Sequence, residues 1–374
     1  MKSHIVIGAG ILGASAAYHL AKAGTKVTVI DRKDPGQATD AAAGIICPWL
    51  SQRRNKAWYA LAKGGAAYYR TLIKELEKDG ETETGYQQAG AVSIHTDPAK
   101  LEKMEERAMK RRDDAPEMGE ITPLSPEQTS RLFPALAKEY ASVHVSGAAR
   151  VNGRALRDAL LRAAEKHGAK GVQGSAELVC QEDEITAVRA GGKQYEAESV
   201  IAAAGAWAGE LFEPLGIQLD VKPQKAQIVH LQLEGDDTAD WPVVMPPNNQ
   251  YILAFEGGRI VMGATHEDDM GYDLRVTAGG LNDIFEKALA IAPGLSNGTF
   301  TEARVGFRPY TPGFLPIIGQ IPGLKGLYIA NGLGASGLTA GPFLGAQLAR
   351  LALGQEVDDI DLSLYDPAGA VKKG

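Results

Sequence analysis

The stretch His4–Asp31, HIVIGAGILGASAAYHLAKAGTKVTVID, sets the fold of this chain. Its two apolar runs, 5–7 and 27–30, have the composition of buried strands. Between them lie the glycine-rich segment 8–13 and a helical segment, 14–22, that ends before Gly24. The order of strand, glycine-rich turn, helix, strand and acid predicts the first βαβ unit of a Rossmann-like domain.

The glycines and the acid have separate physical roles in binding a dinucleotide. Gly8 permits the tight turn, Gly10 lets the backbone approach a pyrophosphate, and Gly13 lets the helix pack close to the strands. The free N–H groups at the helix N-terminus attract the diphosphate. Asp31 can accept hydrogen bonds from the hydroxyls of an adenosine ribose. This motif leaves FAD and NAD equally open, and a glycine-rich turn without a ligand is the structural alternative.

The composition of the chain favours a soluble globular protein over a nucleic-acid-binding, disulfide-rich or metal-binding one. The 374 residues are 44% hydrophobic and 23% charged, which is typical of a soluble globular chain with room for two domains. A net charge of −7 argues against nucleic acid as the main partner. The two cysteines, Cys47 and Cys180, are too few for a disulfide framework or a cysteine-rich metal site, and we expect no metal.

Two features of the sequence indicate the cellular location that we expect for the protein. The first predicted strand begins within five residues of Met1, which leaves no room for a signal peptide. No apolar run is long enough to cross a bilayer. We therefore expect a cytoplasmic protein with no transmembrane segment, and a homo-oligomer is compatible with this interpretation.

Changes in residue composition and in the predicted secondary structure along the chain predict two interleaved domains. Residues 199–207 form a continuous apolar run, typical of a strand buried on both faces, which ends in a second glycine turn at Ala204-Gly205. A third glycine turn, 332–339, opens an apolar helix over 338–353. Residues 171–198 suggest a small β meander, whereas 227–233, 250–254 and 259–263 suggest antiparallel or mixed strands. We predict a mixed α/β fold with a dinucleotide domain from 1–80, 141–220 and 301–374, and a substrate domain, built on a mixed and largely antiparallel sheet, from 81–140 and 221–300.

One basic pair stands apart from these motifs. Arg53 and Arg54 precede a predicted helix over 55–78. They either bind an anion or are simply solvated at the surface.

Taken together, the motifs resemble the D-amino-acid oxidase superfamily, in the branch that contains glycine oxidase, sarcosine oxidase and D-amino-acid dehydrogenase. The resemblance spans almost the whole chain in order. It is carried by Gly8-x-Gly10-x-x-Gly13, Asp31, Ala41-Ala-Ala-Gly44, Ala203-Ala-Gly205-x-Trp207, Gly263-Ala-Thr265, Gly306-x-Arg308-Pro and Gly332-x-Gly-x-Ser-Gly337.

The resemblance implies FAD as the cofactor, held without a covalent bond because no cysteine follows Cys180. It places the flavin against a helix N-terminus, whose dipole stabilises the negative charge of a reduced flavin. The residues it assigns to the cofactor are Gly8, Gly10, Ile11, Leu12, Gly13, Asp31, Arg32, Thr39, Asp40, Ala43, Gly44, Ile45, Glu177, Ala204, Gly205, Trp207, Leu333, Gly334, Ala335, Ser336, Gly337, Leu338 and Thr339.

The same resemblance implies a substrate site around Arg308, whose planar guanidinium can hold a carboxylate by two parallel hydrogen bonds. Tyr251 matches the family's active-site tyrosine, and His266 is a further candidate for the pocket wall. Each has a structural alternative: an arginine that binds loop carbonyls, a core tyrosine and an incidental histidine. Two positions depart from the glycine-oxidase pattern, which has a histidine where this chain has Asn249 and an arginine where it has Ala335.

The expected activity is FAD-dependent oxidation of a small amino acid or N-methyl amino acid, such as glycine, sarcosine or a D-amino acid. The C–N bond becomes an imine that water hydrolyses, and oxygen is the final electron acceptor. The alternatives are a D-amino-acid dehydrogenase that uses a quinone or carrier, an NAD-dependent dehydrogenase, and a flavin subunit of a larger oxidoreductase complex.

Overall fold

The opening stretch of the chain forms the predicted βαβ unit. The computed structural model describes residues 2–235 and 237–372. In it, β1 (Ser3–Ile7), α1 (Ile11–Lys22) and β2 (Lys26–Asp31) follow one another. β1 and β2 are parallel neighbours, and Ile5 lies opposite Thr28. The glycine-rich segment makes the turn from β1 into α1, as predicted.

A six-stranded sheet is built outward from this unit, in the order β19-β20-β12-β1-β2-β8. All its neighbours are parallel except the edge strand β19. The added strands are β8 (Lys170–Gln173), β12 (Ser199–Ala202), β19 (Ile317–Gln320) and β20 (Leu327–Asn331). Because β1, β12 and β20 are parallel, the three glycine turns that follow them lie at one edge of the sheet.

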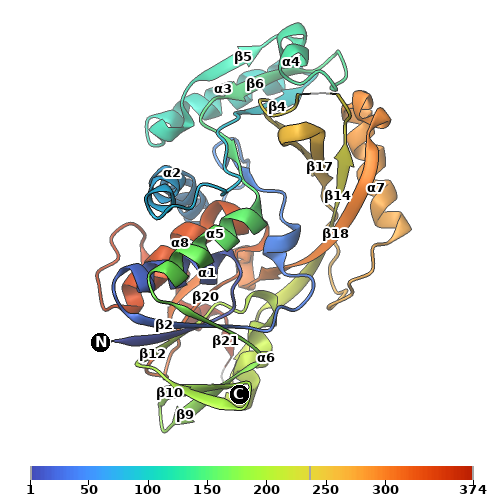
Figure 1. Ribbon diagram of the computed structural model, residues 1–374. Coiled ribbons are helices and arrows are strands. Elements are labelled where there is room, and N and C mark those ends of the chain that lie inside the picture. The colour runs from blue at the N-terminus through green and yellow to red at the C-terminus, as the bar shows by residue number, and fades with distance from the viewer. Residues whose placement is uncertain (1, 236, 373–374) are drawn as a thin grey trace.

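Helices cover one face of this sheet, and a smaller sheet covers the other (Figure 1). The helical side holds α1, α2 (Lys56–Lys78), α5 (Gly153–Lys166) and α8 (Gly337–Ala352). The other side holds the antiparallel strands β9 (Ala176–Gln181), β10 (Glu184–Ala190) and β11 (Lys193–Glu196). Strand side chains alternate accordingly: Val6 packs with the helices, whereas Ile5 and Ile7 pack with β10.

The predicted meander over 171–198 is wrong at its first strand. β8 joins β2 in the large sheet, with Val29 opposite Gly171, and only β9 to β11 form the meander. The preceding helix α5 is a crossover, which returns the chain parallel to the strands already in place.

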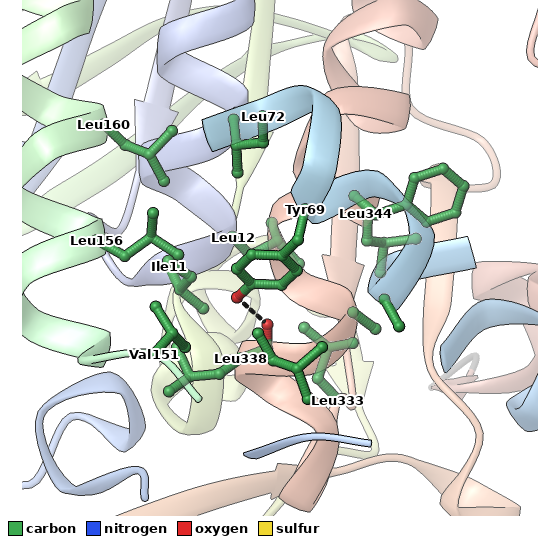
Figure 2. Packing of buried hydrophobic residues seen from close by; sticks show 14 of the residues in the cluster. Ile11, Leu12, Tyr69, Leu72, Val151, Leu156, Leu160, Leu333, Leu338 and Leu344 are labelled. Carbon is green, nitrogen blue, oxygen red and sulfur yellow. Dashed lines mark hydrogen bonds between the residues drawn. The ribbon is translucent and has the colours of Figure 1, made fainter. Parts of the chain in front are cut away.

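The helical layer is tied together by apolar packing and one buried hydrogen bond. Figure 2 shows leucines from α5 and α8 around Tyr69 and Leu72 of α2. The Tyr69 hydroxyl donates to the Leu338 carbonyl at 2.5 Å. Leu338 belongs to the first turn of α8, so this contact fixes the position of that helix start.

A second, eight-stranded sheet has the order β18-β14-β17-β16-β15-β4-β6-β5. Only the β15–β4 pair is parallel, so the sheet is mixed and largely antiparallel, as predicted. Its strands are β4 (Ala91–His95), β5 (Ile121–Leu124), β6 (Ala141–Val145), β14 (Lys222–Gln232), β15 (Val243–Met245), β16 (Tyr251–Ala254), β17 (Arg259–Gly263) and β18 (Thr299–Tyr310). Helix α7 (Ala278–Ile291) packs on β14 and β17, and α3 (Pro98–Arg112) and α4 (Pro126–Leu132) lie near β5 and β6 (Figure 1).

Short elements complete the chain. β3 (Ile45–Ile46) pairs with β7 (Ala149–Arg150), and β13 (Gln218–Leu219) pairs with β21 (Val371–Lys372). Helix α6 (Ala208–Phe212) follows the second glycine turn. No helix in the described part of the chain has both the length and the apolarity needed to cross a membrane.

The mixed α/β fold class is confirmed, whereas the domain boundaries stay a prediction. The eight-stranded sheet includes β6, which begins at 141, and β18, which spans 299–310. Both strands therefore lie beside the segments that we assigned to the substrate domain.

Candidate active site

A cavity of about 440 Å³ lies between the glycine turns of the six-stranded sheet and β14, β16 and β18 of the eight-stranded sheet. Most of the residues predicted for the site line it. They are Gly8, Gly10, Ile11, Leu12, Asp31, Arg32, Thr39, Ala43, Gly44, Ile45, Glu177, Ala204, Gly205, Trp207, Tyr251, Arg308, Leu333, Gly334, Ala335, Gly337, Leu338 and Thr339. The fold thus brings together residues that are more than 300 positions apart in the sequence.

Three residues predicted for the cofactor do not line the cavity. A Cβ on Gly13 would lie 1.9 Å from the Gly8 carbonyl oxygen, so this glycine serves the packing of α1 against the turn. The Asp40 carboxylate instead pairs with Arg157 and, at 3.6 Å, with Arg154. The Ser336 hydroxyl accepts a hydrogen bond from Trp58 Nε1 at 2.9 Å, so it is bound to a residue outside the cavity.

The carboxylate of Asp31 is held beside the first glycine turn by three hydrogen bonds, one from the turn and two from the segment after β2. Its Oδ2 accepts from the Ala9 backbone N–H at 2.6 Å. Its Oδ1 accepts from the Lys33 backbone N–H at 2.5 Å and from Gln37 Nε2 at 3.1 Å. These donors orient the carboxylate and leave it further acceptor capacity, since each oxygen has two lone pairs.

The helix α1 begins without a side-chain cap from its own N-cap residue, Gly10. The Ile11 N–H instead donates to Thr39 Oγ1 at 3.0 Å. Leu12 also lines the cavity in this first turn, where the backbone N–H groups have no partners within the helix. The cavity therefore meets the positive end of the α1 dipole, which favours an anionic group.

The start of α8 also faces the cavity and is fixed by its neighbours. Thr339 Oγ1 donates to the Ile45 carbonyl at 2.9 Å, which ties α8 to β3. Asn331 Nδ2 donates to the Gly205 carbonyl at 2.9 Å, and Asn331 Oδ1 accepts from the Gly332 N–H at 2.6 Å. Asn331 thus joins the second and third glycine turns.

Two glycines of the cavity wall have open space where a side chain would be. A Cβ added to Gly205 or Gly337 would meet no protein atom within 4 Å. The backbone of Gly337 is ordinary α-helix, with φ −53°, so neither strain nor packing requires a glycine there. The free space at Gly337 keeps the helix backbone accessible from the cavity.

Aromatic side chains close the cavity beside Gly205. Trp207 stacks on Tyr272, with ring centroids 5.5 Å apart and planes 10° apart. Phe307 meets both rings edge-on. Tyr272 Oη donates to the Ala206 carbonyl at 2.8 Å, so the 3–10 turn after β12 is fixed to the segment after β17.

Arg308 and Tyr251 reach the cavity from neighbouring strands of the eight-stranded sheet. Antiparallel pairing places Gln224 opposite Arg308 and Gly263 opposite both Tyr251 and Ile228. A Cβ on Gly263 would lie 3.1 Å from Tyr251 Oη. Because Gly263 has no side chain, the Tyr251 ring can lie across β17 toward β14 and β18.

The guanidinium of Arg308 is held by neutral acceptors only. Its Nη1 lies 3.3 Å from Gln224 Oε1 and 3.5 Å from the Thr265 carbonyl oxygen. Within the described residues, no carboxylate oxygen lies within 4.0 Å of it. A half-buried cation therefore faces the cavity with its charge uncompensated.

The phenol of Tyr251 is neutral at physiological pH. Burial raises the pKa of Tyr251 above its usual value, although the nearby Arg308 lowers it in part. Tyr251 can therefore donate a hydrogen bond to an anion beside Arg308.

Asn249 and His266 do not line the cavity, and both side chains are exposed. Partial desolvation lowers the pKa of His266, and the positive charge of Arg308 lowers it further. His266 is thus near enough to Arg308 to respond to its charge. Ala335 does line the cavity, at an exposed position in the third glycine turn. The roles of these three positions stay predictions.

The sequence interpretation missed several residues of the cavity and its supports. Gln37, Ala226, Gly306 and Phe307 line the cavity, and Gln224 holds Arg308. Only strand register brings Gln224 and Ala226 to the site, and no local motif marks them. Gly306 had a signal, since it lies in the Gly-x-Arg-Pro motif: a Cβ there would lie 2.8 Å from Ala41 Cβ.

Comparison with known proteins identifies the family of this chain. The family described as "DAO: FAD dependent oxidoreductase" matches residues 3–351. An uncharacterized oxidoreductase of Bacillus subtilis, YurR, is 64% identical over 372 residues, covering 99% of this chain and 100% of the relative. The glycine oxidase of Pseudomonas aeruginosa is 29% identical and covers 98% of each chain.

Comparison with solved structures also finds related oxidases. The iminodiacetate oxidase (IdaA) of Chelativorans sp. BNC1 is 45% identical, with a TM-score of 0.94 over 97% of this chain and 98% of that one. The glycine oxidase of Geobacillus kaustophilus is 25% identical, with a TM-score of 0.85 over 98% of both chains. The predicted resemblance is thereby confirmed: the chain belongs to the DAO family of FAD dependent oxidoreductases, and FAD is its cofactor.

Proposed function

We propose that this enzyme oxidises a small amine that carries a carboxylate one carbon from its nitrogen, and that it passes the electrons to oxygen. The observation that carries the proposal is Arg308, a half-buried cation on the cavity wall with no carboxylate partner among the described residues. A planar guanidinium with free N–H groups binds a carboxylate in a fixed orientation. Tyr251 would donate a second hydrogen bond to the same carboxylate.

The cavity walls fit an extended dinucleotide. Asp31 would accept from the adenosine ribose, and the N-terminus of α1 would face the diphosphate. The open space at Gly205 and Gly337 is a cradle that a Cβ would fill. The first turn of α8 would then lie along the pyrimidine edge of the flavin, where its dipole favours negative charge. Neither Cys47 nor Cys180 lines the cavity, which supports non-covalent binding.

The substrate class follows from Arg308 and from the related oxidases. When bound, FAD would accept a hydride, which carries two electrons, from the substrate carbon while the amine nitrogen loses a proton, and water would hydrolyse the resulting imine to a keto acid or aldehyde and ammonia or an amine. Arg308 and Tyr251 would fix the carboxylate, so that the carbon–hydrogen bond is held in one orientation. Glycine and iminodiacetate, named by two relatives, share an N–CH₂–COO⁻ unit. We infer that glycine, sarcosine or another N-substituted glycine is the substrate.

Anaerobic mixing with a panel of amines tests this function. We expect glycine, sarcosine or iminodiacetate to bleach the flavin absorbance, because the carboxylate reaches Arg308, whereas the matching amines without a carboxylate leave it unchanged. Re-admission of oxygen should restore the colour within seconds and yield hydrogen peroxide. Bleaching by D-alanine or D-proline but not by the glycine derivatives would contradict the assignment to glycine and N-substituted glycines. Recovery only with a quinone would show a dehydrogenase instead.

Replacing Asp31 tests the dinucleotide end of the cavity. Asp31→Ala removes an acceptor for the ribose and leaves the Ala9 and Lys33 N–H groups without their acceptor. We expect the Kd for FAD to rise about tenfold or more, since hydrogen bonds to charged groups contribute roughly 1.5–3 kcal/mol. Asp31→Asn should have a smaller effect, because one oxygen remains. The exposed Asp358→Ala is the control, and unchanged FAD affinity in Asp31→Ala would rule out the ribose role.

A further inference from the structure

We propose that a second cavity, separate from the FAD site, binds a small polyanion that carries phosphoryl or carboxylate groups. This cavity of about 380 Å³ lies where the segment before α2 meets the last turns of α3. Its charged and aromatic lining residues are Arg53, Arg54, Lys56, Tyr59, Arg107 and Arg111, and its remaining residues carry uncharged amides. We refer to it as the basic cavity.

The charge of the basic cavity is all of one sign. Five cations line it, and no carboxylate does. In the part of the chain that the structure describes, none of the five has an Asp or Glu oxygen within 4.0 Å, although ion pairs are common elsewhere in the molecule. The chain as a whole has a net charge of −7, so this local excess runs against its overall balance. Such a concentration of uncompensated charge attracts anions.

Two of the arginines are held in place by neutral groups. Arg111 Nη1 donates to the Trp49 carbonyl and, at 2.8 Å, to the Ser51 carbonyl. Its guanidinium carbon lies 4.4 Å from the centre of the Tyr59 ring. Arg53 Nη2 donates to the Phe314 carbonyl at 2.5 Å. These contacts fix both side chains without neutralising them, which lowers the ordering cost of binding an anion.

Two buried polar atoms at the basic cavity also lack partners. Arg107 Nε and Tyr59 Oη are both buried, and neither has a hydrogen-bond partner among the described residues. Buried polar atoms without partners are rare, and an unseen ion or water is a usual explanation. Both atoms belong to side chains that line the basic cavity. Because five cations share the space, a ligand with two or more negative charges compensates them better than a single carboxylate does.

The basic cavity adjoins the wall of the FAD cavity. Trp58 Nε1 donates to Ser336 Oγ in the third glycine turn, and the Arg53 guanidinium lies over the Trp58 ring at 4.8 Å from its centre. A polyanion bound here would therefore lie beside the turn that carries Ala335, outside the site assigned to FAD and substrate.

Isothermal titration of the FAD-loaded enzyme with inorganic pyrophosphate, in a phosphate-free buffer of about 0.15 M ionic strength, tests the proposal. A parallel titration uses citrate, so that the tighter of the two probes distinguishes a phosphoryl ligand from a polycarboxylate. We expect saturable binding of one probe per chain. The double variant Arg54→Gln, Arg107→Gln should weaken it by at least about tenfold, since neither side chain donates any hydrogen bond within the described structure and each would bind the anion directly.

The matched control is Lys110→Gln, Arg112→Gln. Both residues are exposed on α3, outside the basic cavity, and the variant loses the same two charges. Its affinity should stay within about twofold of the wild type, because exposed charges at a distance are largely screened. The proposal would be overturned if neither probe showed saturable binding, or if the two double variants weakened binding equally. Flavin absorbance measured in each variant shows that the FAD site is intact.

Discussion

Replacing Arg308 with alanine is expected to lower kcat/KM for the carboxylate substrate by roughly two to three orders of magnitude, because truncating one partner of a desolvated charge pair costs about 2–5 kcal/mol. The loss should be seen mostly in KM if the contact is equally strong in the ground state and the transition state. FAD content should not change, since the hydrogen bonds of Arg308 go to Gln224 and to the Thr265 carbonyl and not to the three glycine turns. Steady-state kinetics and the flavin absorbance per chain measure the two effects.

Two further variants make the Arg308 result specific. Arg308→Lys keeps the charge but loses the planar pair of donors, so we expect it to recover only part of the activity. Arg131→Ala removes the same charge from an exposed side chain on α4 and should leave the kinetics unchanged. If Arg308→Ala has wild-type kinetics, Arg308 does not bind the carboxylate and only supports the loop carbonyl of Thr265.

The dinucleotide half of the molecule could be predicted because its signals are local. The turn at Gly8, the packing at Gly13 and the acid at Asp31 all lie within a single βαβ unit, and each has a physical reason to be that residue. The second and third glycine turns follow buried parallel strands, so the topology brings them to the same edge. Sequence patterns of this kind specify the fold, and they predict which edge of the sheet binds a dinucleotide.

The substrate half could be predicted only in part, because strand register decides it. Arg308 and Tyr251 come together because β18, β14, β17 and β16 are neighbours and because Gly263 leaves room for the tyrosine ring. Nothing local shows that Gln224 lies opposite Arg308. Asn249 is two residues before Tyr251, but it precedes β16, so the alternation of a strand does not bring it to the same face.

Replacing Gly337 tests whether the flavin packs against the first turn of α8, and this test does not require the substrate to be known. An added Cβ at Gly337 meets no protein atom within 4 Å, so Gly337→Ala should leave the free protein as stable as before or slightly more stable, as glycine-to-alanine changes in helices usually do. If the flavin packs against the first turn of α8, the methyl group would overpack that contact. We then expect the Kd for FAD to rise about 5- to 150-fold, the equivalent of roughly 1–3 kcal/mol.

The chain offers a matched control in Gly279. It lies in the first turn of α7, its Cβ would also meet no protein atom within 4 Å, and it does not line the FAD cavity. Gly279→Ala therefore makes the same chemical change in a similar helix position without affecting the flavin. FAD titration of both apoproteins, followed by flavin fluorescence, and their thermal melts without FAD separate affinity from stability. Equal FAD affinity in the two variants would place the flavin away from α8, whatever the substrate proves to be.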